Sequence, residues 1–138
     1  MGQINDTAAA FFDACETGAG WDGCAQYCTD DATFSAQSEA IGDLTDLRSY
    51  TEWMKGILTI LEDGSYDLKS WAVDEERSSV LAYAVFNGTH TGDGGPVPPT
   101  GKAASSDYVY DMRFEGGKIA HITKIWHSGV ALQQLGWA

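Results

Sequence analysis

The sequence predicts an α+β fold, a cone in which a curved antiparallel sheet wraps around N-terminal helices and leaves a central pocket. Helical periodicity dominates residues 7–64, whereas β-rich runs separated by Gly, Pro, Asp and Glu fill residues 65–127. Neither a helix layer nor a sheet buries its apolar side alone, so the helices must cover one face of the sheet. A length of 138 residues without repeats or linkers indicates one domain over residues 1–138.

The first part of the chain is expected to contain two helices, a short strand and a longer helix. Thr7 can cap a first helix over residues 8–18, and a short helix over residues 20–27 follows. A turn then leads into a strand through Phe34. The strongest helical pattern covers residues 45–64. Its apolar stripe consists of Leu47, Tyr50, Trp53 or Met54, Ile57 or Leu58, and Leu61.

The second part supplies the strands of the sheet and a closing helix. The β-rich runs cover residues 65–73, 78–90, 105–115 and 117–127, and a short helix covers residues 129–136. Segment 91–102 is long for a hairpin loop and rich in Gly and Pro, which predicts a rim or lid. In the third run, Tyr108 and Tyr110 belong to an aromatic side that should face inward.

Composition and charge exclude several classes of partner. A formal net charge of −12, with only eight Lys and Arg residues, argues against nucleic-acid and anionic-membrane binding. The N-terminal segment lacks the basic start of a signal peptide, which predicts a cytoplasmic protein. Three cysteines without metal-ligand spacing indicate reduced thiols and no metal site. The Gly-rich loop joins two strands, whereas a phosphate loop joins a strand to a helix, so no cofactor is expected.

Several short motifs occur in a familiar order. They are CTDDATF at residues 28–34, PPTGK at 98–102, GKI at 117–119 followed by Trp126, and QLG at 134–136. In this order the chain resembles the SnoaL-like polyketide cyclases of the NTF2-like superfamily over nearly its whole length. The resemblance implies a conical fold, a homodimer across the open sheet face and an apolar pocket for cofactor-free acid/base chemistry on enolisable carbonyl compounds. Ketosteroid isomerases and limonene epoxide hydrolases look like more distant relatives.

The chain departs from these relatives where they carry catalytic carboxylates. The isomerase-type base would fall within residues 35–37, which contain no acidic side chain, and the cyclase-type acidic position falls on His127 or Ser128. Histidine titrates near neutrality, so His127 is the expected catalytic base, with a surface or interface position as its alternative. His121 is the second choice, and the two histidines lie too far apart along one strand to act on the same atom.

The remaining site candidates are aromatic and apolar. Tyr108 and Tyr110 are expected to donate hydrogen bonds to an oxyanion, with core packing as the alternative. His90, at the end of the second run, is expected near the rim of the pocket or as a turn residue. The expected apolar wall, for which core packing is again the alternative, comprises Phe11, Trp21, Phe34, Trp53, Met54, Ile57, Met112 and Trp126.

These features favour a cofactor-free isomerase or cyclase that acts on a small hydrophobic carbonyl compound. The alternative is a non-catalytic ligand-binding or dimerisation module of the same fold. Epoxide hydration would need an Asp/Arg/Asp set, and only Arg113 among the arginines lies in an expected strand. A titrating side chain that converges on the pocket would favour the enzyme over the module.

Overall fold

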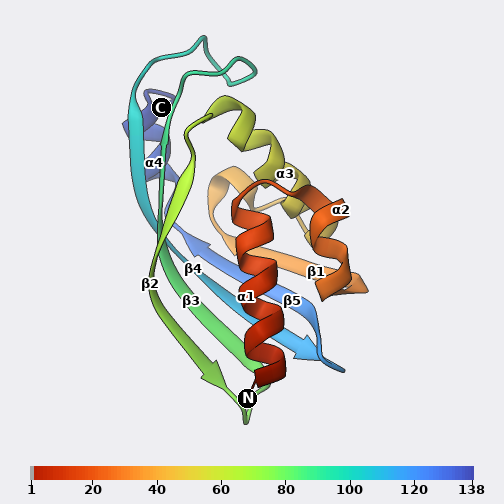
Figure 1. Cartoon of the computed structure of the whole chain (residues 1–138). Helices are drawn as coiled ribbons and strands as arrows, with labels where there is room; N and C mark the ends of the chain where they lie inside the picture. Colours follow the sequence, from red (N-terminus) through yellow and green to blue (C-terminus); the bar gives the residue numbers. More distant parts are fainter. Residues whose placement is uncertain (1) are drawn as a thin grey trace.

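The structure, a computed structural model, describes residues 2–138 and has the α+β architecture that the sequence predicts. Four strands pair antiparallel in chain order: β2 (Ser65–Asp74), β3 (Ser79–Thr89), β4 (Ala103–Glu115) and β5 (Lys118–Trp126). An edge strand, β1 (Cys28–Gln37), joins β5 in parallel, so the order is β1-β5-β4-β3-β2. The sheet curves strongly and does not close on itself (Figure 1).

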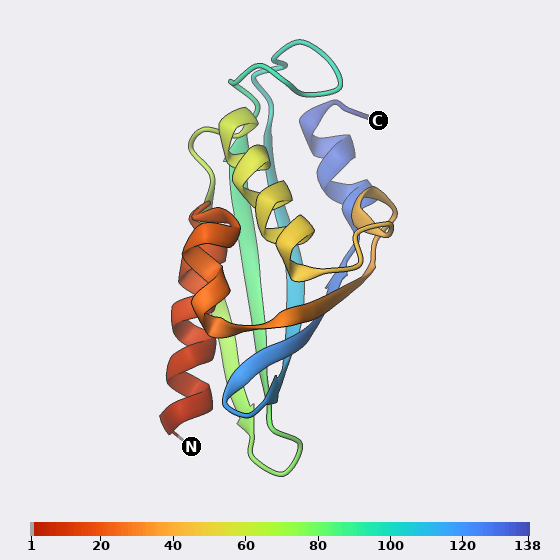
Figure 2. The same ribbon diagram turned by 90° about the vertical axis from the view of Figure 1, so that its right-hand side faces the viewer.

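The helices cover the concave side of this sheet. They are α1 (Gly2–Glu16), α2 (Gly20–Cys24), α3 (Leu47–Ile60) and α4 (Ser128–Leu135), with short 3₁₀ turns η1 (Ala25–Tyr27) and η2 (Glu39–Ile41). Figure 2 shows α1 and α3 lying in front of the strands and α4 beside them, with the loop 91–102 beyond the end of β3 and β4. No helix within residues 2–138 combines the length and the apolar character needed to cross a membrane.

Two local features differ from the sequence-based prediction. Helix α1 begins at Gly2, so Thr7 lies inside the helix and does not cap it. The added turn is held by packing, because Ile4 contacts the core and the Asn5 side chain accepts a 2.6 Å hydrogen bond from Trp71 Nε1. The parallel pairing of β1 was also not expected. It is possible because the connection from β1 to β5 is long and contains α3 and the strands β2, β3 and β4.

The core forms where the helices meet the inward side of the strands. Phe12 of α1 makes edge-on contacts with Tyr66 and Tyr110 at centroid distances of 5.1 and 5.3 Å. On the other side of the cone, Phe34 of β1 stacks on Tyr50 of α3 at 4.2 Å. Aromatic rings therefore fill the space between α1, α3 and the sheet.

Helix α3 has a well-defined start. Asp46 is its N-cap, and its Oδ1 accepts a 2.7 Å hydrogen bond from the backbone N–H of Ser49. This bond lowers the pKa of the Asp46 carboxyl. The backbone of Asp46 also forms a bridge with Thr33 of β1, so the cap fixes the helix next to the edge strand.

Replacing Asp46 with Ala should lower the free energy of unfolding by about 1 kcal/mol at neutral pH, because a cap acceptor is lost. Asp46→Asn keeps an acceptor oxygen and serves as the matched control. The pKa of Asp46 is lower in the folded than in the unfolded protein. Its contribution to the free energy of unfolding is therefore complete at pH values above the unfolded pKa, and it is lost as the pH falls through the folded pKa. Urea denaturation of the three proteins across this pH range measures the effect. Equal stabilities of Asp46→Ala and the wild type at neutral pH would contradict the cap.

Candidate active site

A cavity of about 260 Å³ lies between the helices and the concave face of the sheet. Its apolar wall is formed mainly by Trp53, Met54, Ile57, Phe86, Leu135 and Trp137. The loop 91–102 closes part of it through Gly94, Gly95 and Pro96. The charged groups on this wall, within the described residues, are Glu16 and Lys124. The volume is slightly below the usual range for small-molecule pockets, which fits a compact ligand.

Glu16, the last residue of α1, is a buried carboxylate with only 1% of its surface exposed. The hydroxyl of Tyr108 donates a 2.5 Å hydrogen bond to Glu16 Oε1, and the hydroxyl of Tyr110 donates a 2.6 Å hydrogen bond to Oε2. A buried charge is costly unless hydrogen bonds replace its water shell. The inward side of β4 supplies these two donors because residues 108 and 110 alternate onto the same face.

A chain of hydrogen bonds connects Lys124 to Glu16. Lys124 Nζ donates a 2.9 Å hydrogen bond to the Tyr50 hydroxyl, and the hydroxyls of Tyr50 and Tyr110 are bonded to each other. Because Tyr110 uses its proton toward Glu16, its oxygen accepts from Tyr50. The donors therefore run in one direction, from Lys124 through Tyr50 and Tyr110 to Glu16.

The tyrosines of this network are held in their protonated form. Burial, and then the negative charge of Glu16, raise the pKa of Tyr108, Tyr110 and Tyr50 far above the usual value for a phenol. They therefore stay protonated at neutral pH, where their hydroxyls can donate hydrogen bonds.

Lys124 lies among aromatic rings. Its Nζ is 4.5 Å from the Trp126 ring centroid and 5.1 Å from that of Tyr108, and the rings of Tyr50, Trp53 and Tyr110 are within 5.7 Å. Burial lowers the pKa of Lys124 to about 8, against the opposing effects of Glu16 and Cys15. Lys124 is therefore a cation that can lose its proton near physiological pH.

Five of the residues proposed from the sequence line this cavity. Tyr108, Trp53, Met54, Ile57 and Trp126 all belong to its wall. Trp126 is oriented by a 3.1 Å hydrogen bond from its Nε1 to Ser106 Oγ. Tyr110 is fully buried behind the wall and reaches the site through Glu16. The hydroxyls of Tyr108 and Tyr110, expected to face an oxyanion, are donated to Glu16 here.

Other residues of the predicted apolar wall lie outside the cavity. Phe11 and Met112 are fully buried in the core, and Phe34 is covered by its stacking on Tyr50. Trp21 lies under the Arg48 guanidinium, 5.2 Å from the ring centroid, in a separate hollow. These side chains belong to the buried hydrophobic core of the protein.

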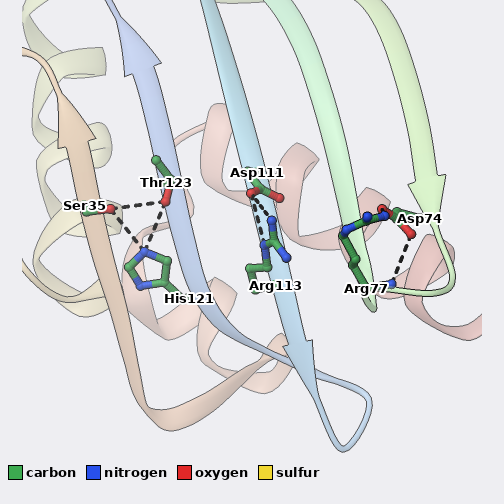
Figure 3. Close-up of polar contacts among 7 residues, drawn as sticks. All are labelled: Ser35, Asp74, Arg77, Asp111, Arg113, His121 and Thr123. Carbon is green, nitrogen blue, oxygen red and sulfur yellow. Dashed lines mark hydrogen bonds and ion pairs between the residues drawn. The ribbon is translucent and has the colours of Figure 1, made fainter.

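The structure does not bring His121 or His127 to the cavity. His121 lies on the outer face of the sheet, where its Nε2 is 3.1 Å from Ser35 Oγ and 3.2 Å from Thr123 Oγ1 (Figure 3). His127 is exposed at the N-cap of α4 and lines a separate hollow with Ser38 and Glu39. Strand alternation explains this, because Lys124 and Trp126 take the inward positions of β5.

His90 is buried and holds the loop 91–102 against the C-terminal tail. Its Nδ1 accepts a 2.9 Å hydrogen bond from Trp137 Nε1 and a 3.3 Å hydrogen bond from the backbone N–H of Thr100. On the other side of the loop, Gly92 donates a backbone hydrogen bond to Ile60 O, and a Cβ at Gly92 would lie 2.0 Å from Thr59 O. The loop therefore packs closely over the cavity, as the prediction of a rim or lid requires.

The two charged residues of the site were missed by reasoning from the sequence, although each carries a signal. Glu16 follows Phe12 by four residues, so it falls on the apolar side of α1. Lys124 lies between Ile122 and Trp126 on the inward side of β5. A charged residue at a position that the periodicity assigns to the core is unusual, and this pattern could have identified both residues as candidates for the site.

The described residues offer no metal centre. Residues 2–138 contain no group of three or more His, Cys, Asp or Glu side chains placed to hold a metal ion. Cys15, Cys24 and Cys28 are free and buried near α1 and α2.

A family model described as SnoaL-like polyketide cyclase matches residues 6–135, and a search of curated proteins gives no match. Among solved structures, AclR from Streptomyces galilaeus, a suggested hydroxylase, is 20% identical, with a TM-score of 0.80 and coverage of 100% of this chain and 87% of AclR. IdmH from Streptomyces antibioticus, a suggested polyketide cyclase, is 21% identical, with a TM-score of 0.76 and coverage of 97% and 99%. A suggested SnoaL-like polyketide cyclase from Jannaschia sp. CCS1 is 14% identical, with a TM-score of 0.79 and coverage of 99% and 93%. These likenesses confirm the predicted fold.

Replacing Glu16 with Gln should lower the pKa of Lys124 below its value of about 8, because the carboxylate stabilises the ammonium form. Asp13→Asn is the matched control, since Asp13 is an exposed carboxylate one turn earlier in α1. Reductive ¹³C-methylation followed by NMR titration measures each lysine separately. A Lys124 pKa that stays the same in Glu16→Gln would contradict the coupling through the tyrosines.

Proposed function

This chain belongs to the SnoaL-like polyketide cyclase family, and we propose that it is a cofactor-free acid/base enzyme acting on a small hydrophobic carbonyl compound. One observation carries the proposal: Glu16 and Lys124 lie on the wall of an otherwise largely apolar cavity. The apolar wall binds the body of the ligand, and the charged end acts on its carbonyl group.

Glu16 is the proposed general base. An ionised carboxylate has about four acceptor sites, and the two tyrosines occupy two of them. The remaining sites can accept a proton from the carbon next to the carbonyl group. The tyrosines hold the carboxylate in one orientation, so that a proton acceptor is fixed at the edge of the cavity.

Lys124 is the proposed electrophilic group. Removal of the proton leaves negative charge on the carbonyl oxygen, and a positive nitrogen beside that oxygen stabilises it. One N–H of Lys124 bonds to Tyr50, which leaves others for the ligand. In this proposal Lys124 stabilises the oxyanion, a role that the sequence predicts for Tyr108 and Tyr110. The hydroxyls of the two tyrosines orient the base instead.

The rival function is a non-catalytic ligand-binding module. That function predicts a cavity without titrating groups, because binding an apolar molecule needs none. A buried carboxylate and a buried amine in the cavity wall favour the enzyme. Burial of both groups has a desolvation penalty, and apolar residues at these positions would make the protein more stable.

Wild-type protein should accelerate exchange of the α-hydrogens of β-tetralone, a hydrophobic ketone, with deuterium from the solvent. Glu16→Gln should reduce this rate by about 10²-fold or more, as expected for loss of a general base. Proton NMR follows the exchange, and the fluorescence of the cavity tryptophans follows binding. Asp13→Asn and His127→Ala are the controls, and both should retain the wild-type rate.

Other outcomes of this experiment are informative. Binding without exchange by the wild type would favour the module. Exchange that survives Glu16→Gln and disappears in His127→Ala would return the role of base to His127.

We further propose that a second copy of the chain covers the open outer face of the sheet. Tyr83, Val109 and Ile125 lie side by side across β3, β4 and β5, and Ile125 is 53% exposed. On this face Asp111 and Arg113 form an ion pair at 2.9 Å, which limits the repulsion between two copies there despite the net charge of −12 (Figure 3). A homodimer would bury this apolar row.

Ile125→Glu should convert the dimer into a monomer, because it places a charge in the centre of the apolar row. Val97→Glu is the matched control, since Val97 is 38% exposed in the loop 91–102, away from this face. Light scattering coupled to size-exclusion chromatography gives the mass of each protein. A monomeric wild type at micromolar concentration, or a dimeric Ile125→Glu, would contradict the proposal.

A further inference from the structure

The geometry around Lys124 points to a covalent role: we propose that its amine adds to the carbonyl carbon of the bound ligand and forms an imine. The inference rests on the proposed function for the site, and it narrows the ligand to aldehydes and ketones. It assigns Lys124 as a nucleophile, in addition to a source of positive charge.

Burial separates Lys124 from the other lysines of the chain. Lys124 is 4% exposed and belongs to the cavity wall. Lys55, Lys69, Lys102 and Lys118 are all exposed. A carbonyl compound in the cavity therefore meets a single amine, in a largely apolar space where water competes little for the carbonyl carbon.

Lys124 also lacks a direct ion pair that would keep it protonated. Within residues 2–138, no carboxylate oxygen lies within 4.0 Å of Lys124 Nζ, and its hydrogen-bond partner is the Tyr50 hydroxyl at 2.9 Å. Burial lowers the pKa of this amine to about 8, so the neutral nucleophile is accessible near physiological pH. An arginine would be the better residue for a permanent charge at this place.

The tyrosine chain provides a route for the proton that must leave. Lys124 can pass a proton to Tyr50 while Tyr50 passes its own to Tyr110, and Tyr110 passes its own to Glu16. The result is a neutral amine at the cavity and a protonated Glu16, without a charge entering the solvent. Each group in this chain donates its hydrogen bond to the next, in the direction from Lys124 to Glu16, and a proton transfer along the chain needs this order.

Imine formation transfers two protons to the oxygen of the carbonyl group. The lone pair of the neutral amine forms a C–N bond, the π pair of the C=O bond moves to oxygen, and that oxygen receives the proton held by Glu16. The second amine proton then moves to the departing hydroxyl, which leaves as water while the C=N bond forms. In sum, an ammonium and a carbonyl compound give a protonated imine and one water.

The protonated imine would make the proposed acid/base step easier. Its positive nitrogen is bonded directly to the carbon that must accept electrons, whereas a hydrogen bond acts only at a distance. Glu16, once more a carboxylate after water is released, can take the α-proton and leave an enamine. One residue pair then performs both steps within one cavity.

The test uses benzoylacetone, a hydrophobic β-diketone that forms a stable, conjugated enaminone with a reactive amine. We expect wild-type protein to develop a near-ultraviolet absorption band and to gain the mass of one probe minus one water, with peptide mapping placing it on Lys124. Lys124→Arg keeps the charge and the donor to Tyr50 but should lose the adduct. Lys118→Arg, an exposed lysine of the same strand, is the matched control and should keep it.

Glu16→Gln adds a readout specific to the tyrosine chain. It removes the acid that protonates the ligand oxygen, so the adduct should form at least tenfold more slowly, although the lower pKa of Lys124 leaves more of the amine neutral. Circular dichroism verifies that each variant is folded. If benzoylacetone does not change the tryptophan fluorescence, saturating cyclohexanone with sodium borohydride replaces it, and absence of a reduced adduct on Lys124 then overturns the proposal.

The deuterium-exchange assay separates failure of the imine from failure of the proposed function. Exchange of β-tetralone without any adduct on Lys124 would overturn the imine and leave the acid/base function intact. Adducts spread over the exposed lysines, or retained in Lys124→Arg, would also overturn it. An adduct on Lys124 without exchange would support the imine and contradict the proposed acid/base function.

Discussion

The burial of Glu16 constrains the arrangement of everything around it. A carboxylate that is 1% exposed must be hydrogen-bonded, and Tyr108 and Tyr110 of β4 meet this need. Its countercharge, Lys124, comes from β5 and is linked through Tyr50 of α3. One network therefore ties α1, α3 and two central strands together. Displacement of any of these elements would leave a buried donor or acceptor without its partner, which fixes the helices over the sheet at the place where the cavity opens.

A network of this kind is poorly explained by stability alone. Replacing a buried charged set with apolar side chains of similar volume is often neutral or stabilising in proteins, because desolvation offsets the attraction between the charges. The core next to this site shows that the fold can use such side chains, since Phe12, Ile122 and Met112 pack there without polar partners. Glu16 and Lys124 are thus exceptions to the rule that core positions are occupied by apolar residues, and such exceptions concentrate at functional sites. The polar network and the cavity it lines are best understood together.

The sequence was sufficient for the fold but only partly for the site. The α+β order, the four β-rich runs and the aromatic inward side of β4 follow from periodicity, because side chains alternate across a strand whatever their contacts are. The parallel pairing of β1 depends on long-range contacts that no local pattern records. For the site, Trp53, Met54 and Trp126 could be predicted as cavity-lining from their apolar stripes. Glu16 could not be paired with Tyr108 across 92 positions of sequence without the structure.

The sequence predicts a histidine as the titrating group of the cavity, whereas the structure places Lys124 on the cavity wall and His121 outside it. Histidine is selected by its ordinary pKa, but burial changes the pKa of any group that loses its water. Side chains alternate between the two faces of β5, and positions 121 and 124 are an odd number of residues apart. His121 therefore lies on the outer face and Lys124 in the cavity. Lys124 then acquires a pKa of about 8, closer to neutrality than any exposed lysine would have. Trp137 and the loop 91–102 line the same cavity as Lys124, so the amine lies at the wall of a largely apolar space. The position of the amine in the fold, more than its residue type, therefore brings its pKa near neutrality.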